Sequence, residues 1–394
     1  MNVFEAIEQQ RDWNNEEQMI LDTVQHLCDE VIAPRAADLD RTDQFPWDNI
    51  KAINDLGLNG LFIPEAYGGT PQSYKLYLHV VMRLAEACAA TSIAYATNFH
   101  AMKPFIEFGN AEQKDRLLPV LARGGLGALA LTEETGGSDA TAMRTRFRPD
   151  GDDIIIDGSK LFITQGDVAD LTLLFGKWSD IEDGAAGDGR AAVSALIMEK
   201  GVPGFSVTRL ERKMGLRGSS TAALSFDGCR VPRQNLLGEP GDGMTILFGF
   251  LNRSRPSIAA HALGIAKAAF NDMTAYMNGR TAAGGRRIID FQGNQFSLAD
   301  MATDLAMCET WIDHVADLID GGSSDFGIEA SMAKMRASDL AMRISTEAVQ
   351  MHGGYGYMCD LRVERLMRDA KITQIWEGTN QLHRQLIGRS FAKR

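Results

Sequence analysis

The stretch DGDDIIIDGSKLFIT, residues 150–164, decides the architecture, because the pattern of apolar residues changes there. A turn of Asp and Gly is followed by three isoleucines and then by a second β-rich run at residues 161–164. β-Branched residues between such turns indicate strands. Similar runs follow at residues 171–175, 193–198 and 224–226. We therefore expect five or six strands between about Gly127 and Leu237, folded as a small antiparallel barrel or sandwich.

Both flanks of this segment have the spacing of helices. From Glu16 to about Arg123, and again beyond Gly243, apolar residues recur every three or four positions, which is the period of amphipathic helices. The order predicts a mostly helical α+β protein with helical domains at residues 1–126 and 239–394 and a β domain at residues 127–238. No Pro-rich linker separates these parts, so we expect them to pack as one unit. The segment SDIEDGAAGDGR, residues 179–190, is predicted to be a surface loop.

Composition and charge narrow the class of protein. Of the 394 residues, 45% are hydrophobic and the formal net charge is −12. No apolar run approaches the ~20 residues that cross a bilayer, and an acidic chain lacks the basic surface that binds nucleic acid. The first residues, MNVFEAIEQQRDWNNEEQ, resemble neither a signal peptide nor a transit peptide.

The five cysteines are widely spaced, with no CxxC pair and no His/Cys cluster at metal spacing. We predict five buried thiols, no metal, and a cytoplasmic protein of bacterial type.

One glycine pattern is rejected as a nucleotide site. Gly125-x-Gly127-x-x-Ala130 matches the loose dinucleotide fingerprint, but that fingerprint needs a strand before it and a helix after it. Here a helical pattern precedes the glycines and a strand pattern follows them. The match therefore gives no support to a nicotinamide cofactor.

A glutamate between an indole and a glycine stands near the end of the chain, in IWEGTNQLHR, residues 375–384. Thr379 is a candidate N-cap for a following helix, and a carboxylate on such a turn is suited to act as a base over a substrate. Phe162 and Thr164 lie two apart in a strand, hence on one face, either as a platform for a heterocycle or as a packed sheet face. The glycine-rich stretches at residues 129–139 and 350–357 could approach a ring or an anion, but each alone is better explained as a turn.

Taken together, these stretches resemble the acyl-CoA dehydrogenase family along almost the whole chain. The motifs that carry the resemblance are TEETGGSD (132–139), KLFIT (160–164), KMGLRGSST (213–221) with VPRQNLLG (231–238), FQGNQFSLADM (291–301), and QMHGGYGY (350–357) through RDAKITQIWEGTNQLHR (368–384). The resemblance implies an N-terminal helical domain, a central β barrel or sandwich and a C-terminal four-helix bundle. Together these would enclose FAD and an acyl-CoA thioester.

The resemblance also implies residues that bind FAD. In the same chain as the base they are Leu129, Leu131, Thr132, Gly137, Ser138, Phe162, Ile163, Thr164, Thr379, Asn380 and Gln381. Residues similar to those that reach the ADP half of a flavin in a neighbouring subunit are Arg280, Gln292, Gln350, His352, Gly353 and Gly354. A homotetramer, built as a dimer of dimers with FAD at the subunit interface, is therefore expected.

The implied reaction removes one hydrogen from each of two adjacent carbons of the acyl group to give a trans-2-enoyl-CoA. Glu377 would take the α-proton and flavin N5 would accept the β-hydride. The Glu377 backbone N–H and a flavin hydroxyl would polarise the thioester carbonyl, and an apolar pocket beside Trp376 would raise the pKa of the carboxylate. Some relatives carry the base at the position of Ser254, where a serine cannot act as one.

The residues similar to substrate contacts are Ser138, Asn252, Arg253, Ser254, Arg255, Trp376, Gly378 and Arg389, of which Arg389 is equally explained as an ion-pair partner. The helix at residues 94–108 corresponds to the wall of the acyl pocket. An unpaired charge there would be costly, so His100 and Lys103 either meet a polar acyl group or, as we favour, turn toward solvent or a carboxylate such as Glu107. Trp376 is expected to shorten the pocket toward short or branched chains.

The expected partners are an acyl-CoA substrate and electron-transfer flavoprotein as electron acceptor. The rival functions are an enoyl-CoA reductase or an acyl-CoA oxidase of the same fold, and a scaffold that has lost FAD. A monooxygenase or a desulfinase needs no α-proton base, so Glu377 counts against both. The sequence departs from the family pattern at Gln165, where asparagine is usual. His352 and His383 are otherwise explained as loop and helix-surface residues.

Overall fold

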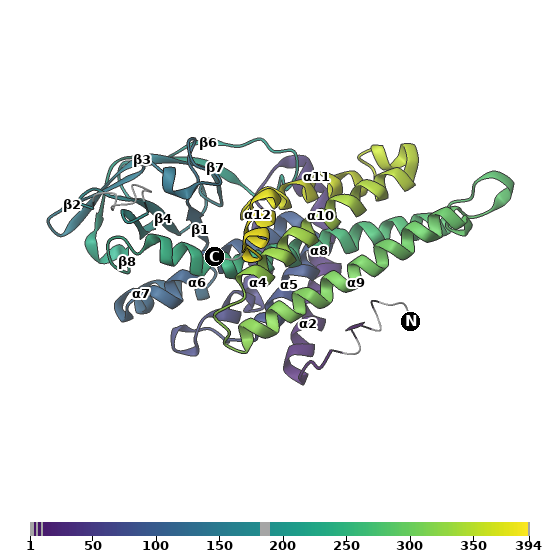
Figure 1. Ribbon diagram of the computed structural model, residues 1–394, viewed down its shortest axis with the longest axis horizontal. Helices are drawn as coiled ribbons and strands as arrows, with labels where there is room; N and C mark the ends of the chain where they lie inside the picture. The colour runs from purple at the N-terminus through teal and green to yellow at the C-terminus, as the bar shows by residue number, and fades with distance from the viewer. Residues whose placement is uncertain (1–3, 5–6, 9–10, 182–189, 393–394) are drawn as a thin grey trace.

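Helices fill the first and last thirds of the chain, and a sheet lies between them in sequence and at one end of the molecule (Figure 1). The computed structural model describes residues 4, 7–8, 11–181 and 190–392. Most of the predicted surface loop at residues 179–190 lies outside the described residues. No helix in the described part of the chain is long and apolar enough to cross a bilayer.

The helices of the first third and the last third follow the predicted periodicity. Those of the first third are α2 (Asn15–Leu27), the π-helix η1 (Cys28–Ile32), α3 (Ala33–Thr42), α4 (Trp47–Asp55), η2 (Leu58–Phe62), η3 (Glu65–Tyr67), α5 (Tyr74–Ala87), α6 (Ala89–Phe108) and α7 (Ala111–Ala122). Those of the last third are α8 (Gly243–Gly279), η6 (Ala283–Gly285), η7 (Ile288–Asp290), α9 (Gln292–Asp320), α10 (Gly327–His352), η8 (Gly353–Tyr357), α11 (Val363–Thr373) and α12 (Asn380–Ser390).

The described residues of the middle third form one eight-stranded sheet. Its strands are β1 (Gly127–Ala130), β2 (Arg146–Asp150), β3 (Asp153–Thr164), β4 (Leu171–Trp178), β5 (Val193–Glu199), β6 (Phe205–Leu210), β7 (Thr221–Pro232) and β8 (Leu236–Leu237), joined by the short helices η4 (Ala140–Ala142) and η5 (Arg233–Asn235). The order is β6-β7-β3-β2-β4-β5-β8, with β1 beside β4. The sheet is mixed rather than purely antiparallel as predicted, because β1 and β2 both pair parallel to β4.

Two predicted strands prove to be one. The runs at residues 154–156 and 161–164 are both part of β3, which continues through Gly158 with a shift in its pairing to β7. A Cβ at Gly158 would stand 2.6 Å from Thr145 Oγ1. Gly158 therefore lets another part of the backbone approach and does not end the strand.

One hydrophobic core joins the first and last thirds of the chain. Buried residues of α2, α5 and α6 pack with those of α8, α9 and α10, including Leu84, Ile93, Leu263 and Ile344. A second cluster joins α6 and α7 to the sheet. The expectation that the parts pack as one unit is confirmed. Cys359 is exposed, so the prediction that all five cysteines are buried was wrong.

Candidate functional site

The candidate base lies on the turn between α11 and α12. Glu377 has φ 51° and Gly378 has φ 92°, and left-handed backbone costs a residue with a Cβ about 1–2 kcal/mol. Thr379 ends the turn and caps α12 as predicted, its Oγ1 accepting from the Leu382 N–H at 3.2 Å. A strained conformation of this kind persists only where the surroundings hold it.

Two buried side chains hold this turn through its backbone. Lys334, on α10, donates to the carbonyl of Gly378 at 2.7 Å and to Asn380 Oδ1 at 3.0 Å. His383 Nε2 donates to the carbonyl of Glu377 at 3.2 Å. His383 is fully buried, so its expected place on a helix surface was wrong. Burial and the nearby cations Arg255 and Lys334 lower the pKa of His383 to about 3, which leaves the ring neutral.

The Glu377 carboxylate accepts a hydrogen bond from Ser254 Oγ at 2.5 Å. Burial raises the pKa of Glu377, and the Ser254 hydrogen bond and the charges of Arg255 and Lys334 oppose that rise. A carboxyl group with a raised pKa is the stronger base once it has lost its proton. Ser254 itself, which we had expected at the substrate, is completely buried on α8.

Two cations lie close enough to act on that carboxylate. Burial lowers the pKa of Lys334 to about 7, against the attraction of Glu377. Burial also lowers the pKa of Arg255, and Glu377 again opposes the shift. Arg255 donates to Asn252 Oδ1 at 3.0 Å and to Ser331 Oγ at 3.3 Å. Of the predicted substrate contacts, Ser254 and Arg255 therefore gather at Glu377.

Arg253, another predicted substrate residue, has a carboxylate partner on α6. Arg253 pairs with Glu107 at 3.2 Å, and Lys103 pairs with the same carboxylate at 3.3 Å. The partner that we favoured for Lys103 is therefore confirmed. His100 instead is buried and bonds Ser257 Oγ at 3.3 Å, so its expected turn toward solvent or a carboxylate was wrong.

Arg389 and Ser138 are both exposed, on the last turn of α12 and in the glycine-rich loop. The structure does not bring either side chain into the group around Glu377.

Trp376 packs against a second buried histidine. Its ring centroid lies 5.9 Å from that of His261 on α8, at an interplanar angle of 56°. Burial lowers the pKa of His261 to about 3. The residue before the candidate base thus faces a neutral imidazole.

A buried ion pair supports the loop at residues 131–139. Lys160 of β3, which is fully buried, bonds Glu133 Oε1 at 2.6 Å and the Leu131 carbonyl at 2.9 Å. The Leu161 N–H also donates to the Thr132 carbonyl at 2.8 Å. Leu129 and Thr132 are partly buried, whereas Gly137 and Ser138 are exposed. The first residues of the loop are therefore held in place, whereas its glycine-containing tip is exposed.

Phe162 presents its ring to the surface. It has φ 58° and its side chain is 61% exposed, while Ile163 is buried. The pairing of β3 with β7 shifts between Lys160 and Ile163, next to Phe162. The exposure rules out a packed sheet face for Phe162 and leaves a platform for a planar ring.

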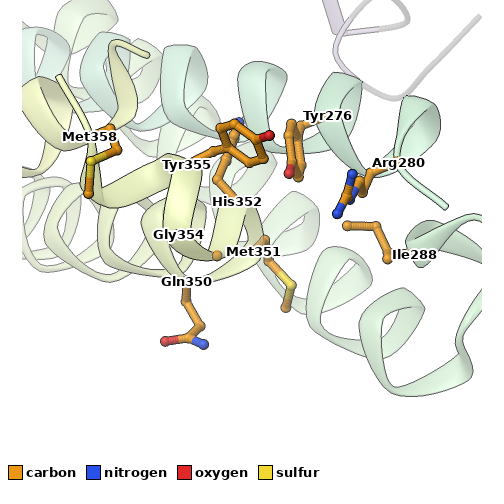
Figure 2. A pocket seen from close by; sticks show the side chains of 10 residues that line it. Tyr276, Arg280, Ile288, Gln350, Met351, His352, Gly354, Tyr355 and Met358 are labelled. Carbon is orange, nitrogen blue, oxygen red and sulfur yellow. The ribbon is translucent and has the colours of Figure 1, made fainter. Parts of the chain in front are cut away.

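A second region gathers where α8 ends and α10 meets η8. A hollow of about 500 Å³ lies there (Figure 2), and the predicted cofactor residues that line it are Arg280, Gln350, His352, Gly353 and Gly354. The Tyr276 ring stacks on His352 with centroids 4.2 Å apart. Gln292 begins α9 and does not line the hollow. His352 is the last residue of α10 and is buried, so the interpretation of His352 as a loop residue was wrong.

The residues at both places fit the expected flavin. An added Cβ at Gly137, Gly353 or Gly354 would meet no atom within 4 Å, so the backbone there is open to a ligand. The exposed Phe162 ring suits the flat isoalloxazine, and Arg280 suits the phosphates of the ADP half. Asn380 is an exception among the predicted contacts, because its side chain is buried and bonds Lys334.

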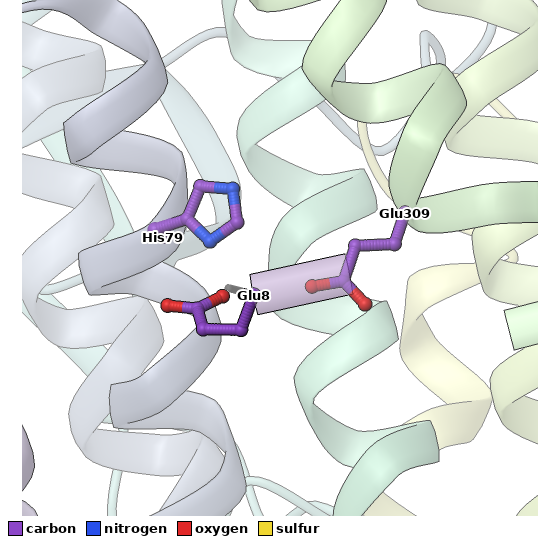
Figure 3. Close-up of side chains that lie close together, drawn as sticks. All are labelled: Glu8, His79 and Glu309. Carbon is purple, nitrogen blue, oxygen red and sulfur yellow. The ribbon is translucent and has the colours of Figure 1, made fainter. Parts of the chain in front are cut away.

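One group of side chains has the composition of a metal site. Ligand atoms of Glu8, His79 and Glu309 all lie within 4.8 Å of one another (Figure 3). Arg11 pairs with both carboxylates, and Lys267 also pairs with Glu309, at 3.2 Å. A metal ion would have to displace these cations. We therefore interpret the group as an ion network that ties the N-terminal residues to α5 and α9.

Two residues of the site were absent from the prediction. Lys334 stands among Ala330, Ala333 and Ala337 on the buried face of α10, and a lysine within such a stripe signals a charge that needs a partner. His261 stands in an equally apolar run of α8. The sequence therefore shows both polar residues in apolar stretches, but it does not indicate which turn each of the two side chains contacts.

Family models match three consecutive parts of the chain. They describe the acyl-CoA dehydrogenase N-terminal domain at residues 14–125, the middle domain at residues 128–229 and the C-terminal domain at residues 241–392. The chain is 43% identical to an acyl-CoA dehydrogenase of Bacillus subtilis over 376 residues, which cover 95% of this chain and 97% of the relative.

Two solved structures have the same fold. The butyryl-CoA dehydrogenase of Megasphaera elsdenii matches with a TM-score of 0.93 and 34% identity, covering 98% of this chain and all of that one. A structure reported with the electron transferring flavoprotein of Acidaminococcus fermentans, in work on flavin-based electron bifurcation, matches with a TM-score of 0.92 and 38% identity. It covers 97% of this chain and 99% of its own.

Proposed function

Because this chain belongs to the acyl-CoA dehydrogenase family, we propose that it dehydrogenates an acyl-CoA thioester between the α- and β-carbons, with Glu377 as the base. The family consists of FAD flavoproteins, and the chain is an oxidoreductase that acts on CH–CH groups. When bound, FAD supplies the acceptor for the hydride that leaves the β-carbon.

The observation that carries the proposal is the position of the Glu377 carboxylate. It lies on a strained turn, is held by Ser254, and has a pKa that burial raises. The α-hydrogen of a thioester is a weak acid, so a base must be oriented and must not be over-stabilised by hydrogen bonds. Ser254 orients one oxygen of the carboxylate and leaves the other to take the proton.

The backbone beside the base can polarise the substrate carbonyl. Among the described residues, no acceptor is found for the Glu377 N–H. An N–H donor on the same residue as the base would stabilise the negative charge that develops on the thioester oxygen as the α-proton leaves. His383 and Lys334 hold the carbonyls of Glu377 and Gly378, which follow this N–H in the turn.

The Glu377→Gln variant tests the base. Anaerobic mixing of the holoenzyme with a panel of acyl-CoA thioesters should bleach the flavin band, and the variant should do so more slowly by roughly 10²-fold or more. Glu112→Gln, at an exposed position in the first turn of α7, is the matched control and should bleach as the wild type does. Unchanged bleaching in Glu377→Gln would refute the assignment of the base.

We propose further that the enzyme works in the bacterial cytoplasm, in fatty acid or amino acid catabolism. The proposed electron acceptor is electron-transfer flavoprotein, and the similarity to the structure from Acidaminococcus fermentans supports this choice. The proposed assembly is a homotetramer, a dimer of dimers. Its support is the distance between the two cofactor regions: Ser254 and Arg280 are 26 residues apart along α8, or about 39 Å. The hollow at Arg280 therefore suits a flavin that belongs to a second copy.

A further inference from the structure

Several buried polar atoms near the base have no hydrogen-bond partner among the described residues, and two of them, Trp376 Nε1 and His261 Nε2, belong to rings that pack against each other. Buried polar groups in native proteins are nearly always satisfied by protein, water or ligand. Trp376 directly precedes Glu377 in the chain, so this ring pair stands beside the proposed base.

The hydrogen-bond pattern determines which proton each atom offers. Ser92 Oγ uses its single proton to bond the Val81 carbonyl at 2.9 Å. It must therefore accept the hydrogen bond that joins it to His261 Nδ1 at 3.1 Å. A neutral imidazole with a proton on Nδ1 has none on Nε2, which is then an acceptor. Trp376 Nε1 can only donate.

The pair thus presents one donor and one acceptor. A hydroxyl satisfies both, since it accepts from Trp376 and donates to His261. A carbonyl or an ether oxygen satisfies only Trp376, and a carboxylate would face the lone pair of His261. A hydrocarbon chain satisfies neither.

We propose that the acyl group carries a hydroxyl that binds between Trp376 and His261. The hydroxyl stands on a carbon beyond the β-carbon, because the α- and β-carbons form the new double bond. The inference rests on the proposed function. His261 is fixed within the core by Ser92, whereas Trp376 is only partly buried, so the indole is the side of the pair that moves to admit the hydroxyl.

The neighbouring wall is also polar. Tyr77 OH lies 2.9 Å from Ser257 Oγ, and Ser257 Oγ lies 3.3 Å from His100 Nε2. His100 stands on α6, at the position that the family resemblance assigns to the acyl pocket. Both His100 and His261 are kept neutral by burial, which suits an uncharged polar group and not an acid.

A matched substrate series tests the proposal with the intact holoenzyme. We would measure kcat/KM for pentanoyl-CoA, 4-hydroxypentanoyl-CoA, 5-hydroxypentanoyl-CoA and 4-oxopentanoyl-CoA. One of the two hydroxy thioesters should exceed both pentanoyl-CoA and the 4-oxo thioester at least about tenfold, because each of the latter leaves at least one buried group unpaired. If pentanoyl-CoA reacts as well as both hydroxy thioesters, the proposal is wrong. If none of the four bleaches the flavin, and no other acyl-CoA does, it is the proposed function that fails.

Two variants test whether the preference for a hydroxy thioester depends on Trp376 and His261. His261→Phe and Trp376→Phe each remove one of the two groups while retaining a ring, and each should bring the hydroxy-to-pentanoyl ratio close to one. Trp376 lies on a partly exposed turn, so Trp376→Phe still tests the proposal if His261→Phe does not fold. The matched controls are Trp311→Phe and His314→Phe, an exposed ring pair on α9 with centroids 5.1 Å apart, which should keep the wild-type ratio. A ratio unchanged in Trp376→Phe would overturn the assignment.

Discussion

Glu377 owes its chemistry to a balance between burial and three neighbours. Burial raises its pKa, while Ser254, Arg255 and Lys334 limit the rise. The base is active as the carboxylate, so the rate should increase as pH rises through this pKa. The free energy of unfolding should fall over the same pH range. A carboxyl whose pKa is higher in the folded state than in the unfolded state stabilises the fold only while it is protonated, and this contribution is lost as pH rises through the folded-state pKa. The sequence alone led to the prediction that Glu377 is the base, but it could not show which neighbours set the pKa of Glu377.

Ser254→Ala tests how much the hydroxyl of Ser254 alone affects the pKa of Glu377. The substitution removes a hydrogen bond that favours the charged form, so the pKa of Glu377 should rise further. The acid limb of kcat/KM against pH should therefore move to higher pH, with the plateau at high pH less affected. Ser390→Ala is the control, because Ser390 is exposed on α12 and its Oγ donates to the Ile387 carbonyl at 2.7 Å, not to a carboxylate. An acid limb that stays in place would show that Ser254 does not act on the base.

At the scale of the element, the turn between α11 and α12 requires a left-handed backbone conformation at Glu377 and Gly378. The residues of the two flanking helices do not adopt this conformation. Gly378 has φ 92°, and a Cβ there would stand 3.1 Å from His383 Nε2. The tryptophan, glutamate and glycine are adjacent in sequence and were readily identified as a functional turn. The side chains that hold the turn come from α8, α10 and α12, and their convergence depends on how those helices pack.

Gly378→Ala tests the importance of this backbone. We expect a loss of about 1–2 kcal/mol of stability from the left-handed conformation and a fall in the rate of flavin bleaching, because the displaced turn moves Glu377. Gly388→Ala, within α12 and with no atom within 4 Å of an added Cβ, should instead stabilise the protein by roughly 0.5–1 kcal/mol. Thermal unfolding and anaerobic bleaching of both variants provide the comparison. Equal behaviour of the two alanines would contradict the role of the turn.

At the scale of the whole molecule, α8 separates the residue that bonds the proposed base, Ser254, from the hollow at Arg280, by 26 residues. The hollow at Arg280, Gln350 and His352 is formed by two separate segments of the chain (Figure 2), and their grouping was predictable only through the family resemblance. Periodicity could not supply it, because residues 280 and 350 become neighbours only when α8 and α10 pack together.

Mixed oligomers test whether this hollow serves a second copy. Arg280→Glu should lower the FAD content per chain, measured as flavin absorbance relative to protein after gel filtration, because an acidic group would repel the phosphates. Chains with Arg280→Glu, co-expressed with chains that carry Glu377→Gln, should recover part of the activity that each lacks alone. The former retain the base and the latter retain the arginine. Arg41→Glu, at an exposed position of α3, should bind FAD normally, and failure to complement would contradict a shared site.

The sequence by itself determined the order of helices, strands and helices and the family, and it pointed to the proposed base, because helix period, strand composition and motif order are local properties of the chain. It did not reveal the short strands β2, β6 and β8, the parallel pairing with β4, or the burial of His383. Only the tertiary structure brought Ser254 and Lys334 to Glu377, across 123 and 44 residues to the turn. It also placed His261 against Trp376 and oriented the proton of that imidazole through Ser92. These features depend on which helix faces meet, and that is decided by the packing of one shared core.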